Sequence, residues 1–97
     1  MKKIALQVET CDNVATIFAD GVVAGSKITV RNKQGTEYEL AVIGDVPYGH
    51  KIAVVDIKKG ENIVKYGETI GIASKDISRG EYVHIHNIDA LRGRGDL

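Results

Sequence analysis

The sequence predicts a mostly β protein, built from short bent strands that tight turns connect, with one short helix near the N-terminus. The chain has 97 residues, the size of a single domain spanning 1–97. Eleven glycines accompany one proline, and this balance suits many tight turns in a small fold. Between the glycines lie short runs rich in Val, Ile and Tyr, which are typical of strands.

The N-terminal segment predicts a strand followed by the helix. Residues 4–8 alternate apolar side chains with polar or small ones, which is the period of a half-buried strand. Asp12 can then cap a short helix over 13–20, NVATIFAD, whose apolar side chains recur at helical spacing. Gly21 follows as a helix stop, and no other segment favours a helix.

Six further runs predict the remaining strands. Each is rich in β-branched or aromatic residues and is bounded by glycine or other turn residues. They are KITVRN (27–32), YELAVI (38–43), KIAVVDI (51–57), NIVKY (62–66), TIGIA (69–73) and YVHIHN (82–87). Because exposed strand edges can pair with another copy, we also expect a tendency to form homo-oligomers.

An internal repeat predicts two copies of one chain corner. DIKKGENIVKY, at 56–66, and DISRGEYVHIH, at 76–86, share Asp-Ile-x-x-Gly-Glu at an offset of 20 residues. Gly60 and Gly80 are expected to take a positive φ, where a side chain would clash. The aspartate that opens each copy is expected to accept hydrogen bonds from turn amides. The repeat therefore indicates architecture rather than chemistry.

The charge balance and the cysteine count exclude several classes of protein. Thirteen basic residues match thirteen acidic ones, so no basic surplus indicates a nucleic-acid partner. The single cysteine, Cys11, excludes an internal disulfide and suits a reducing compartment. The apolar run near the N-terminus breaks at Gln7, too early for a signal peptide, and no run approaches a membrane span. We therefore expect a cytoplasmic protein that binds neither nucleic acid nor membrane.

Two histidines of the last predicted strand are candidate site residues. His84 and His86 are two positions apart, so on a strand both would project from one face while Ile85 faced the core. Two imidazoles at this spacing can ligate one metal ion. His50, after the turn-rich GDVPYG, could approach the same face. The alternative is that exposed strand histidines have no function, since His-x-His alone is a weak motif.

Lys51, Lys65 and Tyr66 form a second candidate set, each beside a glycine turn or a histidine. A lysine in a cleft can bind a substrate carboxylate or, when desolvated, act as a base. The alternative is an ordinary solvated surface lysine. Arg92 and Arg94, in the tail LRGRGDL, could bind an anionic ligand or a neighbouring subunit, and a frayed terminus is the equal alternative.

Taken together, residues 49–87 resemble a known family. The ordered motifs are His-Lys-x-Ala, Asp-Ile-x-x-Gly, Lys-Tyr-Gly, Ile-Gly-x-Ala, Asp-Ile-x-x-Gly-Glu and Val-His-x-His-Asn. This string resembles the N-terminal SAF domain of the altronate and galactarate dehydratase family, which includes the small subunit of sulfolactate sulfo-lyase. DNVATIFAD, at 12–20, matches as well, so the resemblance covers most of the chain.

The resemblance implies a SAF β-clip fold and a lyase activity. The family removes water or sulfite from sugar acids and related hydroxy acids, and it commonly uses Fe²⁺, with Mn²⁺ as a substitute, in the complete enzyme. By matching positions, catalytic roles fall to His50, Tyr66, His84 and Asn87, metal binding to His84 and His86, and substrate binding to Lys51 and Lys65.

Family members with full activity usually carry a second, much larger domain or subunit, and nothing in this sequence resembles it. The chain is thus expected to be a small subunit, or a piece, of a hydro-lyase that converts altronate or galactarate to a 2-keto-3-deoxy acid. Its expected partner is a large dehydratase subunit. The alternative is a non-catalytic SAF module that recognises a carbohydrate or a partner protein, because a fold alone does not fix a function.

Overall fold

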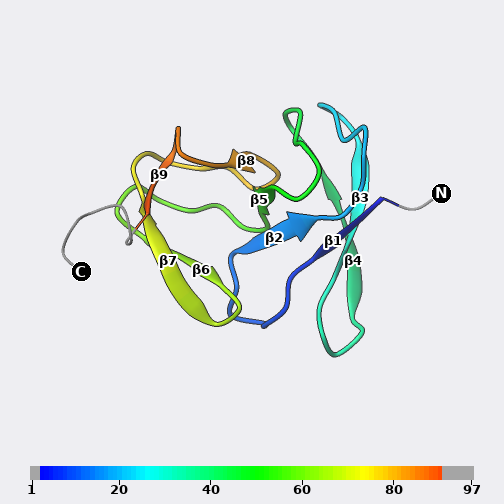
Figure 1. The fold of residues 1–97 in the computed structure, drawn as a ribbon, viewed down its shortest axis with the longest axis horizontal. Coiled ribbons are helices and arrows are strands. Elements are labelled where there is room, and N and C mark those ends of the chain that lie inside the picture. Colours follow the sequence, from blue (N-terminus) through cyan, green and yellow to red (C-terminus); the bar gives the residue numbers. More distant parts are fainter. Residues whose placement is uncertain (1–2, 91–97) are drawn as a thin grey trace.

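The computed structural model describes residues 3–90 and contains nine short strands in two sheets (Figure 1). The first sheet has six strands in the order β4-β3-β1-β2-β5-β8, and the second has three in the order β6-β7-β9. The strands are β1 (Ile4–Leu6), β2 (Val14–Ile17), β3 (Lys27–Arg31), β4 (Glu37–Ala41), β5 (Lys51–Ala53), β6 (Asn62–Lys65), β7 (Glu68–Ala73), β8 (Tyr82–Val83) and β9 (Ile88–Ala90).

The mostly β fold with short, bent strands is confirmed, but the helix predicted over 13–20 is wrong. This segment contains β2, which pairs antiparallel with both β1 and β5. All four residues of β2 are buried, because each face of the strand packs into a different cluster. A strand covered on both faces reads as a continuous apolar run, which periodicity does not separate from a buried helix. Within residues 3–90 no helix is long and apolar enough to cross a membrane.

Two clusters of buried side chains hold the sheets together. The first is centred on one face of the six-stranded sheet and contains Ala5, Ala15, Ile17, Val22, Ile28, Val30, Leu40, Val42, Val46, Ile52 and Val54. The second lies toward the β6–β7 hairpin and contains Val14, Ala53, Ile57, Ile63, Ala73, Ile77 and Val83. Figure 1 shows the β3–β4 and β6–β7 hairpins at opposite ends of the molecule, with β2 and β5 between them. The two central strands, β2 and β5, therefore contribute side chains to both clusters.

The two repeat copies form two corners that exchange hydrogen bonds. An isolated antiparallel bridge joins Ile57 to Ile77. Asp56 Oδ1 accepts the amide of Arg79, and Asp76 Oδ1 accepts the amide of Lys59, both at 2.8 Å. The prediction that these aspartates bond to turn amides is confirmed, although each one binds the corner of the other copy.

Positive φ angles at the two repeat glycines are also confirmed. Gly60 has a φ of 91° and Gly80 has a φ of 89°. The amide of Gly80 donates to the carbonyl of Ala53, at 2.8 Å, so the second corner is pinned to the end of β5. Because this corner is fixed, the start of β8 at Tyr82 is fixed as well.

Candidate functional site

The run 82–87, predicted to be one strand, folds instead as the two-residue strand β8 and a tight turn over 84–87. The amide of Asn87 donates to the carbonyl of His84 at 3.0 Å, which closes the turn. In return, the amide of His84 donates to the side-chain oxygen of Asn87 at 2.9 Å. Such local bonds from an asparagine side chain compete with a strand ladder and end it.

Because of this turn, His84 and His86 do not project from one face of a strand. Ile85, between them, was predicted to face the core, but 80% of its surface is exposed. His84 is half-buried and His86 is exposed. The two rings still belong to one group, because each of them contacts the ring of Tyr82.

Asn87 lies under the turn rather than at its surface. Its side chain is fully buried, and its amide nitrogen donates to the carbonyl of Tyr82 at 2.9 Å. The same nitrogen lies 3.5 Å from a carboxylate oxygen of Glu81. With the bond to the amide of His84, both ends of the Asn87 side chain are occupied within the turn. The position of Asn87 suits holding the histidines in place better than touching a substrate.

Three histidines and one tyrosine meet at the edge of the six-stranded sheet, and we call them the histidine cluster: His50, Tyr82, His84 and His86. The ring centroids of His50 and His84 are 4.9 Å apart. The Tyr82 hydroxyl is hydrogen-bonded to His50 Nδ1 at 2.7 Å, and the Tyr82 ring stacks on His84 with 7° between the planes. His50 thus approaches His84, as predicted, although His84 lies in a turn.

Strand pairing explains why His50 meets His84. Lys51 in β5 is the register partner of Val83 in β8, so the residue before one lies opposite the residue after the other. The backbone of His50 is fixed on both sides, because its amide donates to Pro47 and its carbonyl accepts from Ile17 at 2.8 Å. Two short strands therefore bring together side chains that are far apart in the sequence.

Lys51 lies beside the histidine cluster and is half-buried. Burial lowers the pKa of Lys51 from its ordinary 10.5, and the positive charge of Lys65 lowers it further. Thr16, the register partner of Lys51 in β2, has a buried hydroxyl with no hydrogen-bond partner among residues 3–90. Neither Lys51 nor Lys65 forms an ion pair within that part of the chain. Among the described residues, these two ammonium groups therefore have no counter-ion.

The same electrostatic field acts on His84. Loss of hydration lowers the pKa of His84 from its ordinary 6.5, and positive charge on His50, Lys51 and His86 lowers it further. The ring is therefore neutral at neutral pH and keeps a free lone pair. A neutral imidazole beside the ammonium group of Lys51 can accept a proton from a bound anion.

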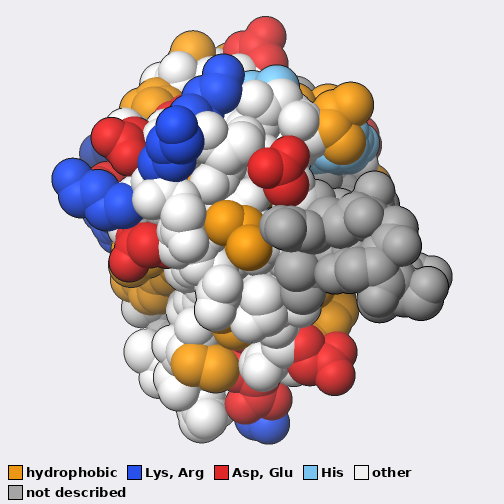
Figure 2. Space-filling view, turned by 90° about the vertical axis from the view of Figure 1, so that its left-hand side faces the viewer, with side chains coloured by type: hydrophobic (Ala, Val, Ile, Leu, Met, Phe, Trp, Pro, Cys, Tyr) orange, Lys and Arg blue, Asp and Glu red, His pale blue; other side chains and the backbone are white. Residues whose placement is uncertain are grey.

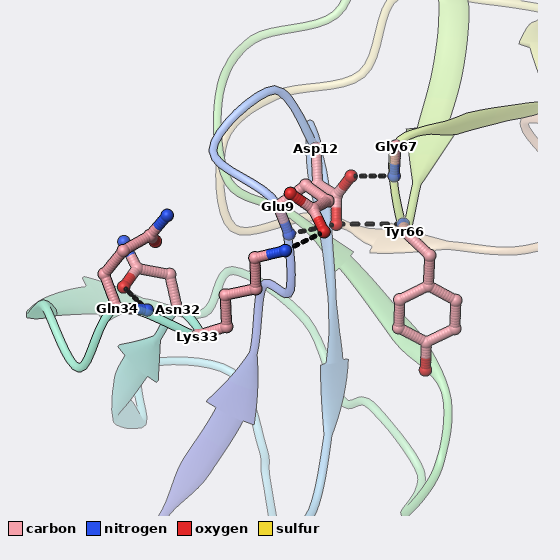
Figure 3. Close-up of polar contacts among 7 residues, drawn as sticks. All are labelled: Glu9, Asp12, Asn32, Lys33, Gln34, Tyr66 and Gly67. Carbon is pink, nitrogen blue, oxygen red and sulfur yellow. Dashed lines mark hydrogen bonds and ion pairs between the residues drawn. The ribbon is translucent and has the colours of Figure 1, made fainter.

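Lys65 is the last residue of β6, and Tyr66 follows it in the turn to β7. Tyr66 has a positive φ of 55° and 53% of its surface is exposed. Lys65 Nζ lies 4.8 Å from the centre of the Tyr66 ring. Figure 3 shows how Asp12 holds this turn, since its carboxylate accepts the amides of Tyr66 at 2.9 Å and Gly67 at 2.8 Å. Asp12, predicted to cap a helix, instead caps the turn that carries Lys65 and Tyr66.

The described residues do not fit a complete metal centre. Within residues 3–90 no three His, Cys, Asp or Glu side chains lie where they could hold one metal ion. Lys51 acts electrostatically on His84, so the field at the cluster also disfavours a cation. A ferrous or manganous site that uses His84 and His86 would need further ligands from elsewhere. The candidate residues Arg92 and Arg94 lie outside the described residues.

The histidine cluster is open to the surroundings. Figure 2 views the end of the molecule that carries β7 and β9, and histidine atoms reach the surface near the upper edge of this view. Basic and acidic side chains are interspersed over the described part of this face. Sequence reasoning missed Tyr82. The signal that could have found it is its spacing, because Tyr82 lies two positions before His84 and would share its face on the predicted strand.

The model of one protein family matches this chain over residues 3–91, and its description is altronate/galactarate dehydratase SAF domain. The match includes the histidine cluster, both lysines and Tyr66.

Three similar proteins place this domain in two kinds of chain. Altronate dehydratase of Escherichia coli (strain K12) is 42% identical over 82 residues, which cover 84% of this chain and 15% of that enzyme. Galactarate dehydratase (L-threo-forming) of the same organism is 38% identical over 78 residues, 80% of this chain and 14% of that enzyme. (2R)-sulfolactate sulfo-lyase subunit alpha of Chromohalobacter salexigens is 35% identical over 83 residues, 84% of this chain and 87% of that subunit.

Proposed function

The chain belongs to the altronate/galactarate dehydratase SAF-domain family, and we propose that it forms one wall of the active site of a hydro-lyase. The proposed reaction dehydrates a sugar acid such as altronate or galactarate to a 2-keto-3-deoxy acid. The proposed setting is the cytoplasm, where Cys11 stays reduced.

The proposal is supported by two ammonium groups that have no ion-pair partner within residues 3–90, one of which, that of Lys51, lies beside the imidazole of His84. Burial lowers the pKa of the half-buried Lys51, and repulsion by the positive charge of Lys65 lowers it further, so the charged ammonium is unfavourable in the free chain. An anion bound between them would relieve that repulsion. Sugar acids carry such an anion, and the proton next to their carboxylate is the one that dehydration removes.

The chemistry assigned to this chain is binding and proton transfer. Lys51 and Lys65 would bind the carboxylate and stabilise the negative charge that develops when the neighbouring C–H bond breaks. His84 would accept that proton as a neutral base. The hydroxyl on the next carbon leaves as water after taking a proton, and the resulting enol rearranges to the keto acid. Tyr66, which is exposed, would contact a substrate oxygen.

A larger partner would supply the rest of the site. The chain spans only 15% and 14% of the two dehydratases, whereas it spans most of the sulfo-lyase subunit. We propose that it works with a large dehydratase subunit or domain. The ferrous ion implied by the family resemblance would be held mainly by that partner, because residues 3–90 do not fit a complete metal centre.

We propose a sugar acid as the substrate because the sequence identity to altronate dehydratase is higher than the identity to the sulfo-lyase subunit. The size match to the sulfo-lyase subunit makes sulfolactate the second candidate. It offers the same carboxylate to the two lysines, with sulfite in place of hydroxide as the leaving group.

Capture of the complex tests this function. The tagged chain is expressed in its native host, purified without oxygen and analysed by mass spectrometry, and the captured complex is assayed with altronate, galactarate and sulfolactate. We expect a stoichiometric partner several times larger and turnover of a sugar acid. Turnover of sulfolactate alone would replace the substrate. A chain that is recovered alone, or only as a homo-oligomer, and without activity would overturn the proposal in favour of a binding module.

A further inference from the structure

Within the histidine cluster, the Tyr82 side chain contacts each of the three histidines. Its hydroxyl is hydrogen-bonded to His50 Nδ1 at 2.7 Å, and its ring stacks on His84 with centroids 5.6 Å apart. The same ring lies 5.4 Å from that of His86 in a tilted arrangement. Its position is fixed by strand pairing, because Tyr82 is the register partner of Ile52, which is fully buried.

The polarity of the bond between Tyr82 and His50 decides which proton His50 presents. A phenol is a better donor than a neutral imidazole N–H, and an imidazole nitrogen is a better acceptor than a phenol oxygen. A separation of 2.7 Å lies at the short end for an N–H donor and is ordinary for an O–H donor. Among residues 3–90 the Tyr82 hydroxyl has no other hydrogen-bond partner. If His50 donated, the hydroxyl proton would be left without an acceptor there.

We infer that Tyr82 is a positioning residue that donates its hydroxyl proton to His50 Nδ1 and so fixes neutral His50 as the tautomer with its proton on Nε2. The backbone of His50 is already held by hydrogen bonds to Pro47 and Ile17, so the Tyr82 hydroxyl has only the orientation of the His50 ring left to fix. Within the described residues His50 Nε2 has no hydrogen-bond partner, which leaves its N–H free for a ligand.

This tautomer gives the two neighbouring histidines different tasks. Neutral His50 can only donate a hydrogen bond at Nε2, so it suits a substrate oxygen and neither accepts a proton nor ligates a metal there. Among the described residues the His84 ring makes no such hydrogen bond, so its lone pair stays available. The division of roles rests on the proposed function, whereas the tautomer itself does not depend on it.

Nitrogen-15 NMR of the histidine rings in the full 97-residue chain tests the inference. Spectra are recorded at about pH 8.5, two units above the ordinary imidazole pKa, so that the rings are neutral. We expect His50 to show an unprotonated Nδ1 and a protonated Nε2. A proton on Nδ1 would overturn the inference from the wild-type spectrum alone, without any variant.

The variant Tyr82→Phe isolates the hydroxyl, since a phenylalanine ring preserves the stack on His84. We expect His50 to lose the single tautomer and to show averaged nitrogen shifts, while the amide spectrum confirms that the chain is folded. Tyr48→Phe is the matched control, because Tyr48 is exposed and its ring meets that of Phe18 in a T-shaped arrangement. The inference is wrong if Tyr82→Phe leaves the tautomer as in the wild type or if the control changes it equally.

The outcome separates this inference from the proposed function. In the captured complex, Tyr82→Phe should reduce kcat with little change in the substrate concentration needed for half-maximal rate. If the tautomer is as inferred but no sugar acid is turned over, only the proposed function fails. If turnover occurs and His50 carries its proton on Nδ1, only the role of Tyr82 fails.

Discussion

A carboxylate oxygen of Asp12 accepts a hydrogen bond from the backbone amide of Gly67, at 2.8 Å across a sequence separation of 55 residues (Figure 3). The other oxygen accepts the amides of Glu9 and Tyr66, at 3.0 and 2.9 Å. One buried side chain thus ties the N-terminal turn to the turn that carries Lys65. Part of the candidate site depends on a residue that does not reach a substrate.

Asp12→Ala should destabilise the chain and loosen this turn. Removal of the carboxylate leaves three amides without their acceptor, and we expect a loss of roughly 2–4 kcal/mol in the free energy of unfolding. Urea denaturation followed by circular dichroism measures it. Asp20→Ala is the control, because Asp20 is exposed, and it should change stability by less than about 0.5 kcal/mol. An Asp12→Ala chain as stable as this control would contradict the assigned role.

The two repeat corners predict unequal costs for the same substitution. In Gly60→Ala a methyl group meets nothing nearby, so only the positive φ is penalised, by about 1–2 kcal/mol. In Gly80→Ala the methyl group would also overlap the backbone carbonyl oxygen of Ala41. We expect a loss above roughly 3 kcal/mol, or failure to fold. Equal melting temperatures for the two variants would show that the corner of Gly80 is looser than described.

Lys51→Met should stabilise the free chain while weakening substrate binding. The charged ammonium is half-buried and repelled by Lys65, so its removal is expected to gain a few tenths to about 1 kcal/mol. Thermal unfolding measures the gain, and assays of the complex should show an increased KM. Lys75→Met, which removes an exposed lysine, should do neither. A destabilised Lys51→Met chain would mean that an unseen anion or contact already neutralises the lysine.

The lowered pKa of His84 makes stability depend on pH in a defined direction. The unfolded chain binds a proton at this residue more readily than the folded chain does, because the unfolded pKa is the ordinary 6.5. The contribution of His84 is therefore fully present above about pH 6.5 and is lost as the pH falls through the lower, folded pKa. Urea denaturation from about pH 8 to pH 5 should show a shallower loss in His84→Gln than in the wild type. Parallel curves would refute the shift.

Much of the fold could be predicted from the sequence because local rules decide it. The two Asp-Ile-x-x-Gly copies predicted both corners, and Gly60 and Gly80 take the expected positive φ. A related corner went unnoticed at 45–49, DVPYG, where Val46 forms a bridge like that of Ile57. The helix prediction for 13–20 failed because both faces of β2 are buried, which removes the alternation of apolar and polar residues that marks a strand.

The sequence predicts several residues of the candidate site but not how they are arranged in space. His50, Lys51 and His84 could be named as polar residues near turns, but the pairing of β5 with β8 is a long-range event that no local pattern reveals. The turn at 84–87 depends on Asn87 inserting its side chain under its own backbone, which competes with the strand predicted by the flanking residues. Tyr82 was overlooked because its importance lies in contacts with three rings rather than in a motif.

We propose that His84 performs proton transfer in an active site that this chain shares with a larger partner. The most direct measurement is sugar-acid turnover by the captured complex containing His84→Ala, with circular dichroism and size-exclusion chromatography to verify folding and assembly. We predict an assembled complex whose kcat is reduced about 10²–10⁴-fold, the usual contribution of a general base. A folded, assembled variant that keeps wild-type turnover would contradict the assignment.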